Sequence, residues 1–313
     1  MTGAISPPTI WRTKLRSLKP DVDHVEQVAH NFDDGIVGIG WGLEDLPSRT
    51  PLDEVLAALE AKDEPGWGRR AMWTVRRFGR EAQVGDFIWT RDLAGRFRLG
   101  RLAGHYRYVN NAKATRTDTH QVRRCDWAQP PLGDLQVPGG IIRAFSGTSS
   151  SFERIHDEGA RRYTAWLWDD LHGRQPEPLA FAPAEVLAQL EPYDLEDLIY
   201  TWMQIRGDYL ALPRARRTDT PAYEWTMLHR KTHRPAIVQV KSGGQSVDLE
   251  QLASAAPDAE TALFAYSAAE SYTGSPDREV QRITTAQLLT LVEKHPDVLP
   301  PRVRRWFELA TGG

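Results

Sequence analysis

The sequence predicts two domains, each of mixed α and β structure. At 313 residues the chain is too long for one ordinary core and suits two domains of about 150 residues each. Short apolar runs typical of strands alternate with stretches whose apolar residues recur at helical spacing. Residues 169–183 combine charge, a glycine and three prolines, which is typical of a linker. We therefore expect a first domain over 1–170, a linker over 171–183 and a second domain over 184–313.

The composition is that of a globular protein. Hydrophobic residues make up 41% and charged residues 26% of the chain, which is enough to bury two cores. No run of about 18 apolar residues is present, so no membrane-spanning helix is expected. The N-terminal residues lack the apolar middle of a secretory signal, and the single cysteine, Cys125, can form neither an internal disulfide nor a cysteine-based zinc site. These features favour a cytoplasmic protein without a membrane partner.

Positive charge is concentrated in two stretches, although the net charge is −3. Lys and Arg outnumber Asp and Glu between positions 60 and 125 and again between 204 and 242. Both stretches are candidate phosphate-facing surfaces. The alternative is that they are the solvated faces of ordinary helices and strands. The negative total argues against a protein that coats nucleic acid non-specifically.

The first half is expected to contain a half-exposed β-sheet with helices. Apolar residues alternate with Arg or cluster between glycines in the expected strands, at 36–41, 86–90, 97–108 and 121–127. A helix is expected over 52–59, with Thr50 as its N-cap and Pro51 at its first position. A second helix is expected over 69–80.

The second half has a clear order of helix, three strands, helix and strand. The expected elements are a helix at 193–205, strands at 209–212, 223–229 and 236–241, a helix at 248–255 and a strand at 261–267. A strand at 280–283 and helices at 285–294 and 302–309 follow. Because a polar turn joins the second and third strands, these two are expected to form a hairpin.

Polar residues of this hairpin are the candidate catalytic groups. Gln239 and Lys241 alternate by two in an otherwise apolar strand, so both face the same side, and a lysine there needs a partner because burying an unpaired ammonium is costly. Glu224 lies in the other arm, and the helix at 193–205 could bring Glu196 to the same edge. The Glu224 carboxylate and the Gln239 amide suit the oxygen coordination of Mg²⁺, with Mn²⁺ as a substitute. Such a metal could activate water on a phosphodiester, and Lys241 could stabilise the transition state or orient that water.

These residues resemble the motifs of the PD-(D/E)xK nuclease superfamily, and in particular the Mrr-like restriction endonuclease catalytic domain. Leu195-Glu196-Asp197-Leu198-Ile199 matches the helix motif of that family, and Gln239-Val240-Lys241 matches its third-strand motif in the glutamine form. Glu224 stands where the family usually has Asp, which keeps the charge and lengthens the reach. The resemblance covers about positions 185–270. It implies an αβββαβ core, Mg²⁺-dependent endonuclease activity on double-stranded DNA, and a homodimer for double-strand cutting.

The first half resembles a PUA-like fold of the EVE/YTH type. The resemblance is carried by the segments Gly38–Gly42, Val84–Trp89 and Leu99–Tyr106, in which glycines and tryptophans flank short apolar runs. It implies a small barrel with helices that reads a modified base after extruding it from the duplex. The pocket residues that it suggests are Trp41, Trp89, Tyr106 and Trp127, with Asp86 or Asp126 as readers of the base edge. Each aromatic ring is equally well explained as part of the core.

Together, the two resemblances imply a modification-dependent, type IV-like restriction endonuclease that acts on foreign DNA. The alternatives are a non-catalytic reader of DNA or RNA, an endonuclease of ordinary sequence specificity, and a subunit of a larger defence complex. A nuclease fold that binds without cutting also remains open. Finally, Glu224 and Lys241 could form a cross-strand ion pair in a generic α/β domain.

Overall fold

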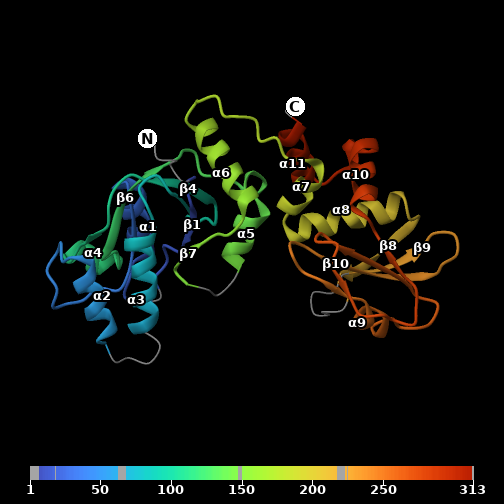
Figure 1. Ribbon diagram of the computed structural model, residues 1–313, viewed down its shortest axis with the longest axis horizontal. Coiled ribbons are helices and arrows are strands. Elements are labelled where there is room, and N and C mark those ends of the chain that lie inside the picture. Colours follow the sequence, from blue (N-terminus) through green and yellow to red (C-terminus); the bar gives the residue numbers. More distant parts are fainter. Residues whose placement is uncertain are drawn as a thin grey trace, which may run out of the picture. The chain divides into compact units, whose positions relative to one another are not determined.

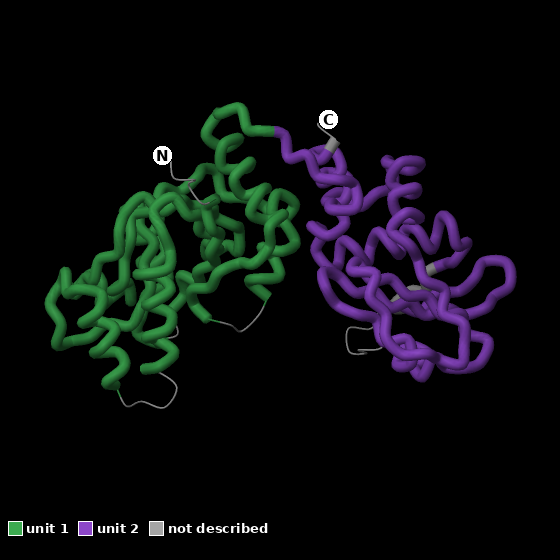
Figure 2. The backbone as a smooth tube through the Cα atoms, in the orientation of Figure 1, with its two compact units in different colours: residues 1–177 green, residues 178–313 purple. Residues whose placement is uncertain are grey.

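The chain divides into two compact units, residues 1–177 and 178–313 (Figures 1 and 2). The division falls within the segment 171–183 that the sequence suggests as a linker. Each unit has its own sheet and its own hydrophobic core. The computed structural model describes residues 7–17, 19–62, 68–146, 150–216, 223 and 225–311, without the side chains of 211–216 and 311.

Unit 1 is built on a seven-stranded sheet that curls into a half-barrel. The strands are β1 (Ile10–Thr13), β2 (Ile36–Ile39), β3 (Phe87–Arg91), β4 (Phe97–Leu102), β5 (Arg107–Tyr108), β6 (Gln121–Trp127) and β7 (Phe152–Arg154). They follow the order β2-β6-β4-β3-β1-β7, with β5 paired to β6, and only β1 and β3 pair in parallel among the described strands of this sheet. The sequence suggested a barrel. Within the described residues β2 and β7 do not pair with each other, so the sheet does not close.

The helices of unit 1 are α1 (His24–Asp33), α2 (Leu52–Glu60), α3 (Gly68–Arg76), α4 (Ala112–Thr117), α5 (Gly139–Ser146) and α6 (Glu158–Leu171). A 3₁₀ turn, η2 (Asp134–Gln136), precedes α5. The helix expected over 69–80 is α3 followed by one wide π-helical turn, η1 (Arg77–Glu81). The expected N-cap of α2 is wrong, because the Thr50 hydroxyl donates to the carbonyl of Pro47 at 2.7 Å and caps no helical N–H.

Aromatic residues fill the core of unit 1. The rings of Trp11 and Phe152 stack with their centroids 4.9 Å apart, and Phe78 meets Phe152 edge-on at 5.1 Å. All three are buried. This cluster joins β1 and β7 to η1, and it also contains Val28 of α1 and Val37 of β2, so it packs α1 against β2.

Unit 2 has a five-stranded sheet in the order β14-β12-β10-β9-β8. Its strands are β8 (Tyr209–Arg216), β9 (Trp225–His229), β10 (Pro235–Lys241), β12 (Ala262–Ser267) and β14 (Val280–Arg282), and the short strands β11 (Val247–Asp248) and β13 (Tyr272–Thr273) pair separately. β8, β9 and β10 are antiparallel, and β12 lies parallel to both β10 and β14. β8 continues past Pro213, where the sequence predicted its end. An edge strand tolerates proline because its outer N–H groups have no strand partner.

Helices cover both faces of this sheet. They are α7 (Pro183–Gln189), α8 (Pro192–Ile205), α9 (Leu249–Ser254), α10 (Thr285–Lys294) and α11 (Pro301–Thr311), with a 3₁₀ turn, η3 (Pro296–Val298), between the last two. α8 and α9 lie on opposite sides of the sheet (Figure 1). The ring of Tyr200 in α8 lies 5.8 Å from that of Trp225 in β9, and Leu252 in α9 clusters with Ile237 in β10. None of the described helices is long and apolar enough to cross a membrane.

Candidate functional site

A cavity of about 350 Å³ in unit 1 is the first candidate site. Its wall combines four cations, one aromatic ring and three polar side chains, which are Lys14, Arg16, Lys19 and Arg70, then Trp41, then Ser17, Gln27 and Asp118. The backbone of Gly38, Ile39 and Gly40 at the end of β2 completes it, together with Ser151. The volume falls in the range of sites that bind small molecules. Mixed aromatic, amide, carboxylate and cationic groups can bind a ligand that has a flat ring and a negative charge.

Asp118 is the acidic group of the cavity. Only 7% of the residue is exposed. The Ser17 hydroxyl donates to Oδ2 at 2.7 Å, and the ammonium of Lys19 lies 2.8 Å from Oδ1. These contacts fix the carboxylate in one orientation. Each carboxylate oxygen has a further lone pair, so Asp118 can still accept a hydrogen bond from a ligand.

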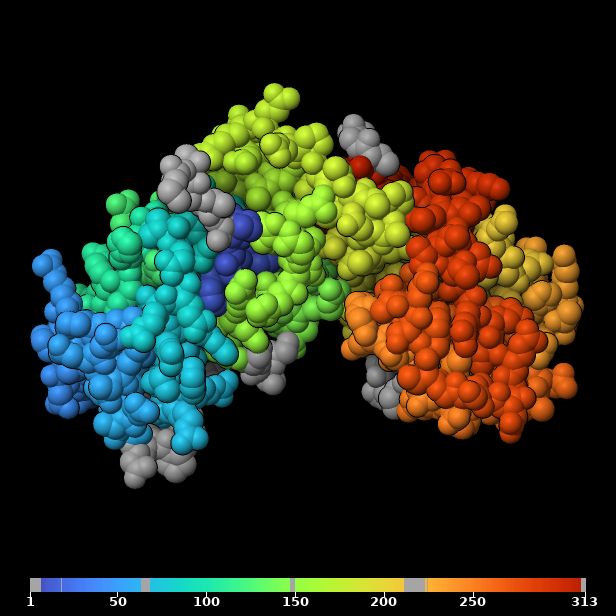
Figure 3. Space-filling model, in the orientation of Figure 1, coloured from blue at the N-terminus to red at the C-terminus, as the bar shows by residue number. Residues whose placement is uncertain are grey.

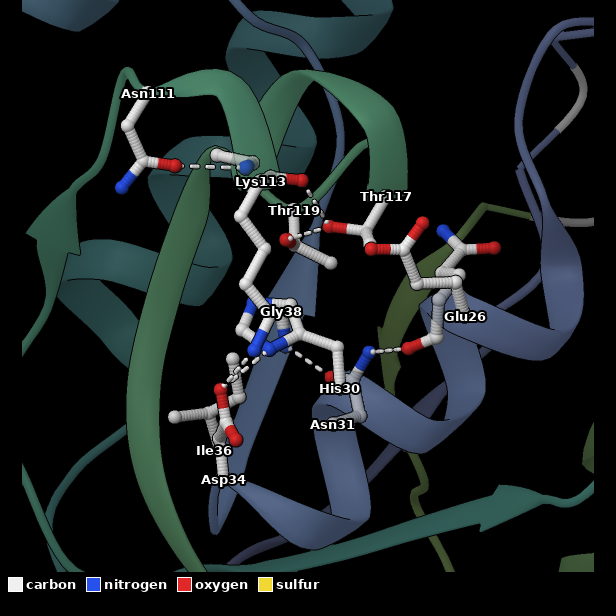
Figure 4. A network of polar contacts seen from close by, with 12 residues as sticks. Glu26, His30, Asn31, Asp34, Ile36, Gly38, Asn111, Lys113, Thr117 and Thr119 are labelled. Atoms are coloured by element: carbon white, nitrogen blue, oxygen red, sulfur yellow. Dashed lines mark hydrogen bonds and ion pairs between the residues drawn. The ribbon is translucent and has the colours of Figure 1, made fainter.

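Gln27 is the amide group of the cavity, and it is 3% exposed. Its Oε1 accepts from the backbone N–H of Ser17 at 3.0 Å, which sets the orientation of the amide. Within the described residues its Nε2 donates no hydrogen bond, so this donor is open to a ligand. Asn31 holds α1 against β2, because its Nδ2 donates to the Gln27 carbonyl at 2.8 Å and its Oδ1 accepts from the N–H of Gly38 at 2.7 Å (Figure 4).

Trp41 leaves β2 on a left-handed backbone with φ of +65°. Its half-buried ring lines the cavity, and its carbonyl accepts from the Gln121 amide at 2.9 Å. The flanking glycines allow a close approach. A Cβ added to Gly40 would lie 2.4 Å from Asp118 Oδ2, and one added to Gly42 would lie 2.3 Å from His120 Nε2. The left-handed backbone of Trp41 costs stability, and the glycines on either side leave no room for a side chain. Such strain is typical of functional sites, so we interpret this turn as part of a binding site.

The cations give the cavity a positive potential. Burial lowers the pKa of Lys14, and the charges of Arg12 and Arg70 lower it further, although Glu153 opposes them. Arg16 and Arg70 are exposed, and neither forms an ion pair with any described residue. With Lys19 paired to Asp118, the cations Arg16 and Arg70 still outnumber the acidic groups of the cavity wall, and such an excess favours a bound anion such as a phosphate.

Of the four aromatic residues predicted for a base pocket, Trp41 lines the cavity and the other three do not. Trp89 is fully buried, and its Nε1 donates to Thr164 at 3.0 Å. Trp127 donates to the carbonyls of Asn31 and Ile36, and the Tyr106 hydroxyl donates to Gln121 at 2.5 Å. Burial raises the pKa of Tyr106. These contacts give the three residues roles in the interior of unit 1.

The two carboxylates predicted to read a base edge lie away from the cavity. Asp86 accepts from the N–H of Thr9 at 2.9 Å, from Trp11 Nε1 at 2.8 Å and from the N–H of Gln83 at 2.9 Å, so it holds β1 against β3. Asp126 is exposed on β6. Neither lines the cavity.

Sequence reasoning missed Asp118 and Gln27. Ser17 and Asp118 lie 101 positions apart in the chain, and no motif links them. The basic run Lys14-x-Arg16-x-x-Lys19 was the available signal, because three cations within six residues mark a candidate anion site.

The second candidate site lies at the end of β10. Gln239 is 4% exposed and Lys241 is half-buried. They pair with Ala265 and Ser267 of the neighbouring strand β12. Strand alternation places both side chains on the face that Ile237 shares with α9. The structure therefore brings the amide and the ammonium to one face, as predicted.

The two predicted glutamates relate differently to this pair. Glu224 lies outside the described residues; the next residue, Trp225, pairs with Val238, the neighbour of Gln239. Glu196 is 8% exposed on α8, one turn before Tyr200, which contacts Trp225. α8 covers the face of Trp225 and Val238, and Gln239 and Lys241 lie on the face covered by α9. A site shared by Glu196, Gln239 and Lys241 would require the Glu196 side chain to extend around the end of the sheet.

The described residues do not by themselves fit a metal site. Among them, no group of three or more His, Cys, Asp or Glu side chains could hold a metal ion. Mg²⁺ prefers carboxylate oxygens, and Gln239 and Lys241 supply one amide oxygen and one cation. The carboxylate expected beside them, Glu224, belongs to the part of the chain that is not described.

Comparisons of the chain with protein-family models, with curated proteins and with solved structures find no match. The resemblances to PD-(D/E)xK nucleases and to PUA-like domains therefore stay predictions from the sequence.

Proposed function

We propose that the protein is a DNA endonuclease that recognises a modified base with unit 1 and hydrolyses the DNA backbone with unit 2. The observation that carries the proposal is the cavity, which joins the Trp41 ring, the Gln27 amide and the Asp118 carboxylate to a positively charged wall. Flipping a base out of a duplex costs a few kcal/mol, and a matching pocket recovers that cost. A modified base in the cavity would thus select the DNA that is cut.

The polar groups of the cavity suit a base that carries an amino group. Gln27 Nε2 can donate to a ring nitrogen or carbonyl of the base, and Asp118 can accept from its amino group. Ser17 contacts both side chains, so the donor and the acceptor lie close together. This pattern fits the hydrogen-bonding edge of cytosine or adenine. Trp41 would stack on the base, and the cations would bind the flanking phosphates.

Unit 2 supports the cleavage step through its order of elements and its polar pair. Apart from the short strand β11 between β10 and α9, which belongs to a separate two-stranded sheet, the order α8, β8, β9, β10, α9, β12 agrees with the αβββαβ core predicted for the nuclease domain. Lys241 would stabilise negative charge on the phosphodiester in the transition state, and the Gln239 amide oxygen would help to hold Mg²⁺. Mg²⁺ held with Glu224 would supply the activated water. The double-stranded substrate favours action as a homodimer with two active sites.

The test is cleavage of plasmids that carry 5-methylcytosine, 5-hydroxymethylcytosine, N6-methyladenine or no modification, with Mg²⁺ and with EDTA. We expect the wild-type protein to cut at least one modified plasmid, only with Mg²⁺, and to spare the unmodified one. Lys241→Ala should lose cutting and keep binding, and Trp41→Ala should lose the preference for modified DNA. Equal cutting of modified and unmodified plasmids would overturn the recognition part of the proposal.

A non-catalytic reader is the second candidate function. The cavity in unit 1 has a stacking ring, a hydrogen-bond donor, an acceptor and cations, which is what a reader of bases needs. Gln239 and Lys241, in contrast, have no carboxylate among their described register partners on the neighbouring strands. The same experiment distinguishes it. A reader would bind modified DNA tightly, would cut none of the plasmids, and would bind equally well as Lys241→Ala.

A further inference from the structure

Trp73 is a large aromatic side chain exposed on the surface of unit 1. It is 46% exposed on α3. The helix beneath it is firmly held, because Ala71 and Val75 are fully buried in a cluster with Val55 and Leu59 of α2. A single exposed apolar side chain is common on protein surfaces, so the residues around Trp73 decide whether it marks an interaction site.

The exposed face of α3 is strongly basic. Arg69, Arg70, Arg76 and Arg77 lie three or four positions from Trp73, which places all five residues along one side of the helix. Within the described part of the chain, none of these four arginines forms an ion pair. The guanidinium of Arg76 lies 5.1 Å from the centroid of the Trp73 ring. A surface of arginines around one tryptophan is complementary to a polyanion that contains flat rings.

The same helix forms part of the cavity rim. Arg70 lines the cavity, and the Thr74 hydroxyl donates to the Arg70 carbonyl at 2.9 Å. Thr74 also lies 3.1 Å from the hydroxyl of Ser150, next to the cavity residue Ser151. Trp73 therefore lies within one helical turn of the cavity wall. The segment that holds α3, coloured cyan, is at the surface of the face seen in Figure 3.

We propose that α3 binds double-stranded DNA beside the cavity and that Trp73 enters the gap left in the base stack when a nucleotide is extruded. This inference rests on the proposed function, because it assigns the element that contacts the duplex around the flipped base. Side chains that enter a base step partly unstack it, and the arginines beside Trp73 would bind the phosphates on either side. Trp41 then stacks on the extruded base, and the Trp73 ring takes the place of that base in the duplex.

The charge of this surface favours DNA over a protein partner. Tryptophan and arginine both occur often at protein interfaces, but four arginines that form no ion pair with the described residues add up to a charge that a polyanion neutralises best. An inserted aromatic ring restores the stacking that the flipped base has lost. The surface should therefore matter for duplexes and should be dispensable for single strands, whose bases are already unstacked.

The experiment compares binding of the full-length protein to two probes of one sequence. The first is a duplex that holds a single 5-methylcytosine, 5-hydroxymethylcytosine or N6-methyladenine, and the second is the corresponding modified single strand. The unmodified duplex serves as the reference for the wild-type protein. We expect Trp73→Ala to weaken duplex binding about tenfold and to leave single-strand binding unchanged. Trp73→Phe should retain most duplex affinity. Trp41→Ala should weaken binding to both probes, and Leu135→Ala, at another exposed apolar residue of unit 1, should change neither.

The outcomes separate this inference from the proposed function. Duplex affinity that is unchanged by Trp73→Ala, in a protein that prefers modified DNA, would overturn the role of Trp73 and leave the proposed function intact. Equal loss of duplex and single-strand binding would also overturn it, because it would place Trp73 in the base pocket. A wild-type protein that binds no modified duplex better than the unmodified one would overturn both.

Discussion

Burial separates tryptophans that look equivalent in the sequence. Trp41 and Trp89 each follow a short apolar run in the first half of the chain. Trp89 is fully buried with its indole N–H bonded to Thr164, and Trp41 lines a cavity on a left-handed backbone. The neighbouring residues in the chain do not distinguish the two, because the contacts that bury an indole come from distant segments.

The first prediction concerns these two residues. Trp89→Ala is expected to lower the free energy of unfolding by about 3–5 kcal/mol, because it leaves a large cavity and removes the hydrogen bond from the indole to Thr164. Trp41→Ala should cost less stability, since its ring is only half-buried, and should instead weaken binding of modified DNA. Urea denaturation and DNA titration on both variants measure this. A stable Trp89→Ala protein that no longer binds DNA would contradict the assignment.

The second prediction concerns pH. Asp194 in the first turn of α8 lies 3.1 Å from Arg302 Nε, but burial outweighs this cation and raises the pKa of Asp194 to about 6. A carboxyl group whose pKa is higher in the folded protein than in the unfolded chain adds stability when protonated. This contribution of Asp194 to the stability is complete below about pH 3.8, and it is lost as the pH rises through about 6.

The stability of wild type relative to Asp194→Asn should therefore fall between pH 4 and pH 7. Denaturant unfolding of both proteins across that pH range gives the difference between their free energies of unfolding. The titration of groups that both proteins share cancels in this difference. A difference that rises with pH would show that the ion pair with Arg302 dominates over burial.

At the scale of elements, the turn after β2 decides the shape of the cavity. β2 ends at Ile39, and Gly40 and Gly42 let the chain pass against Asp118 and His120. The carboxylate of Asp118 is fixed by Ser17 and Lys19, so it has little freedom to move away. The sequence shows the two glycines around Trp41, but their neighbours come from a loop nearly 80 residues further along the chain.

The third prediction follows from this turn. Gly40→Ala should displace the Asp118 carboxylate, because the new methyl group would lie 2.4 Å from Oδ2. We expect a loss of modified-DNA binding of about tenfold or more, since the loss of a hydrogen bond to a charged group is worth about 1.5–3 kcal/mol. Gly133→Ala is the matched control, because its nearest neighbour, Gln136 Oε1, is 3.9 Å away. Equal binding by both variants would argue against Asp118 as a ligand group.

At the scale of the whole molecule, the proposed function divides recognition and cleavage between the two units. Each unit has a separate sheet and a separate core, so each is expected to fold by itself. The net charge of −3 does not reveal the positive surface of unit 1, because the cations of that surface gather at the cavity and along α3. A near-neutral protein can thus present a strongly positive surface to DNA.

The fourth prediction uses this division. Protein expressed as residues 1–177 should keep the affinity of the full chain for modified single strands and should not cut DNA. Protein expressed as residues 178–313 should be folded and should lack the preference for modified bases. Circular dichroism, thermal unfolding and DNA titration check both fragments. Tight, modification-specific binding by the second fragment alone would contradict the division of roles.

The sequence by itself determined the local features of this protein. Periodicity placed most of the helices and strands of the second half, including the β9–β10 hairpin, and alternation put Gln239 and Lys241 on one face. It did not predict β1 or α1, whose short or interrupted apolar patterns carry a weak local signal. It also missed α6, although the residues that this helix buries recur at helical spacing: Ala160, Tyr163, Thr164, Leu167 and Trp168. Only the tertiary structure brought Ser17, Gln27 and Asp118 together, and only it showed which tryptophan lines the cavity. Local periodicity is encoded by neighbours in the chain, but a cavity is formed by contacts between segments that lie far apart in it.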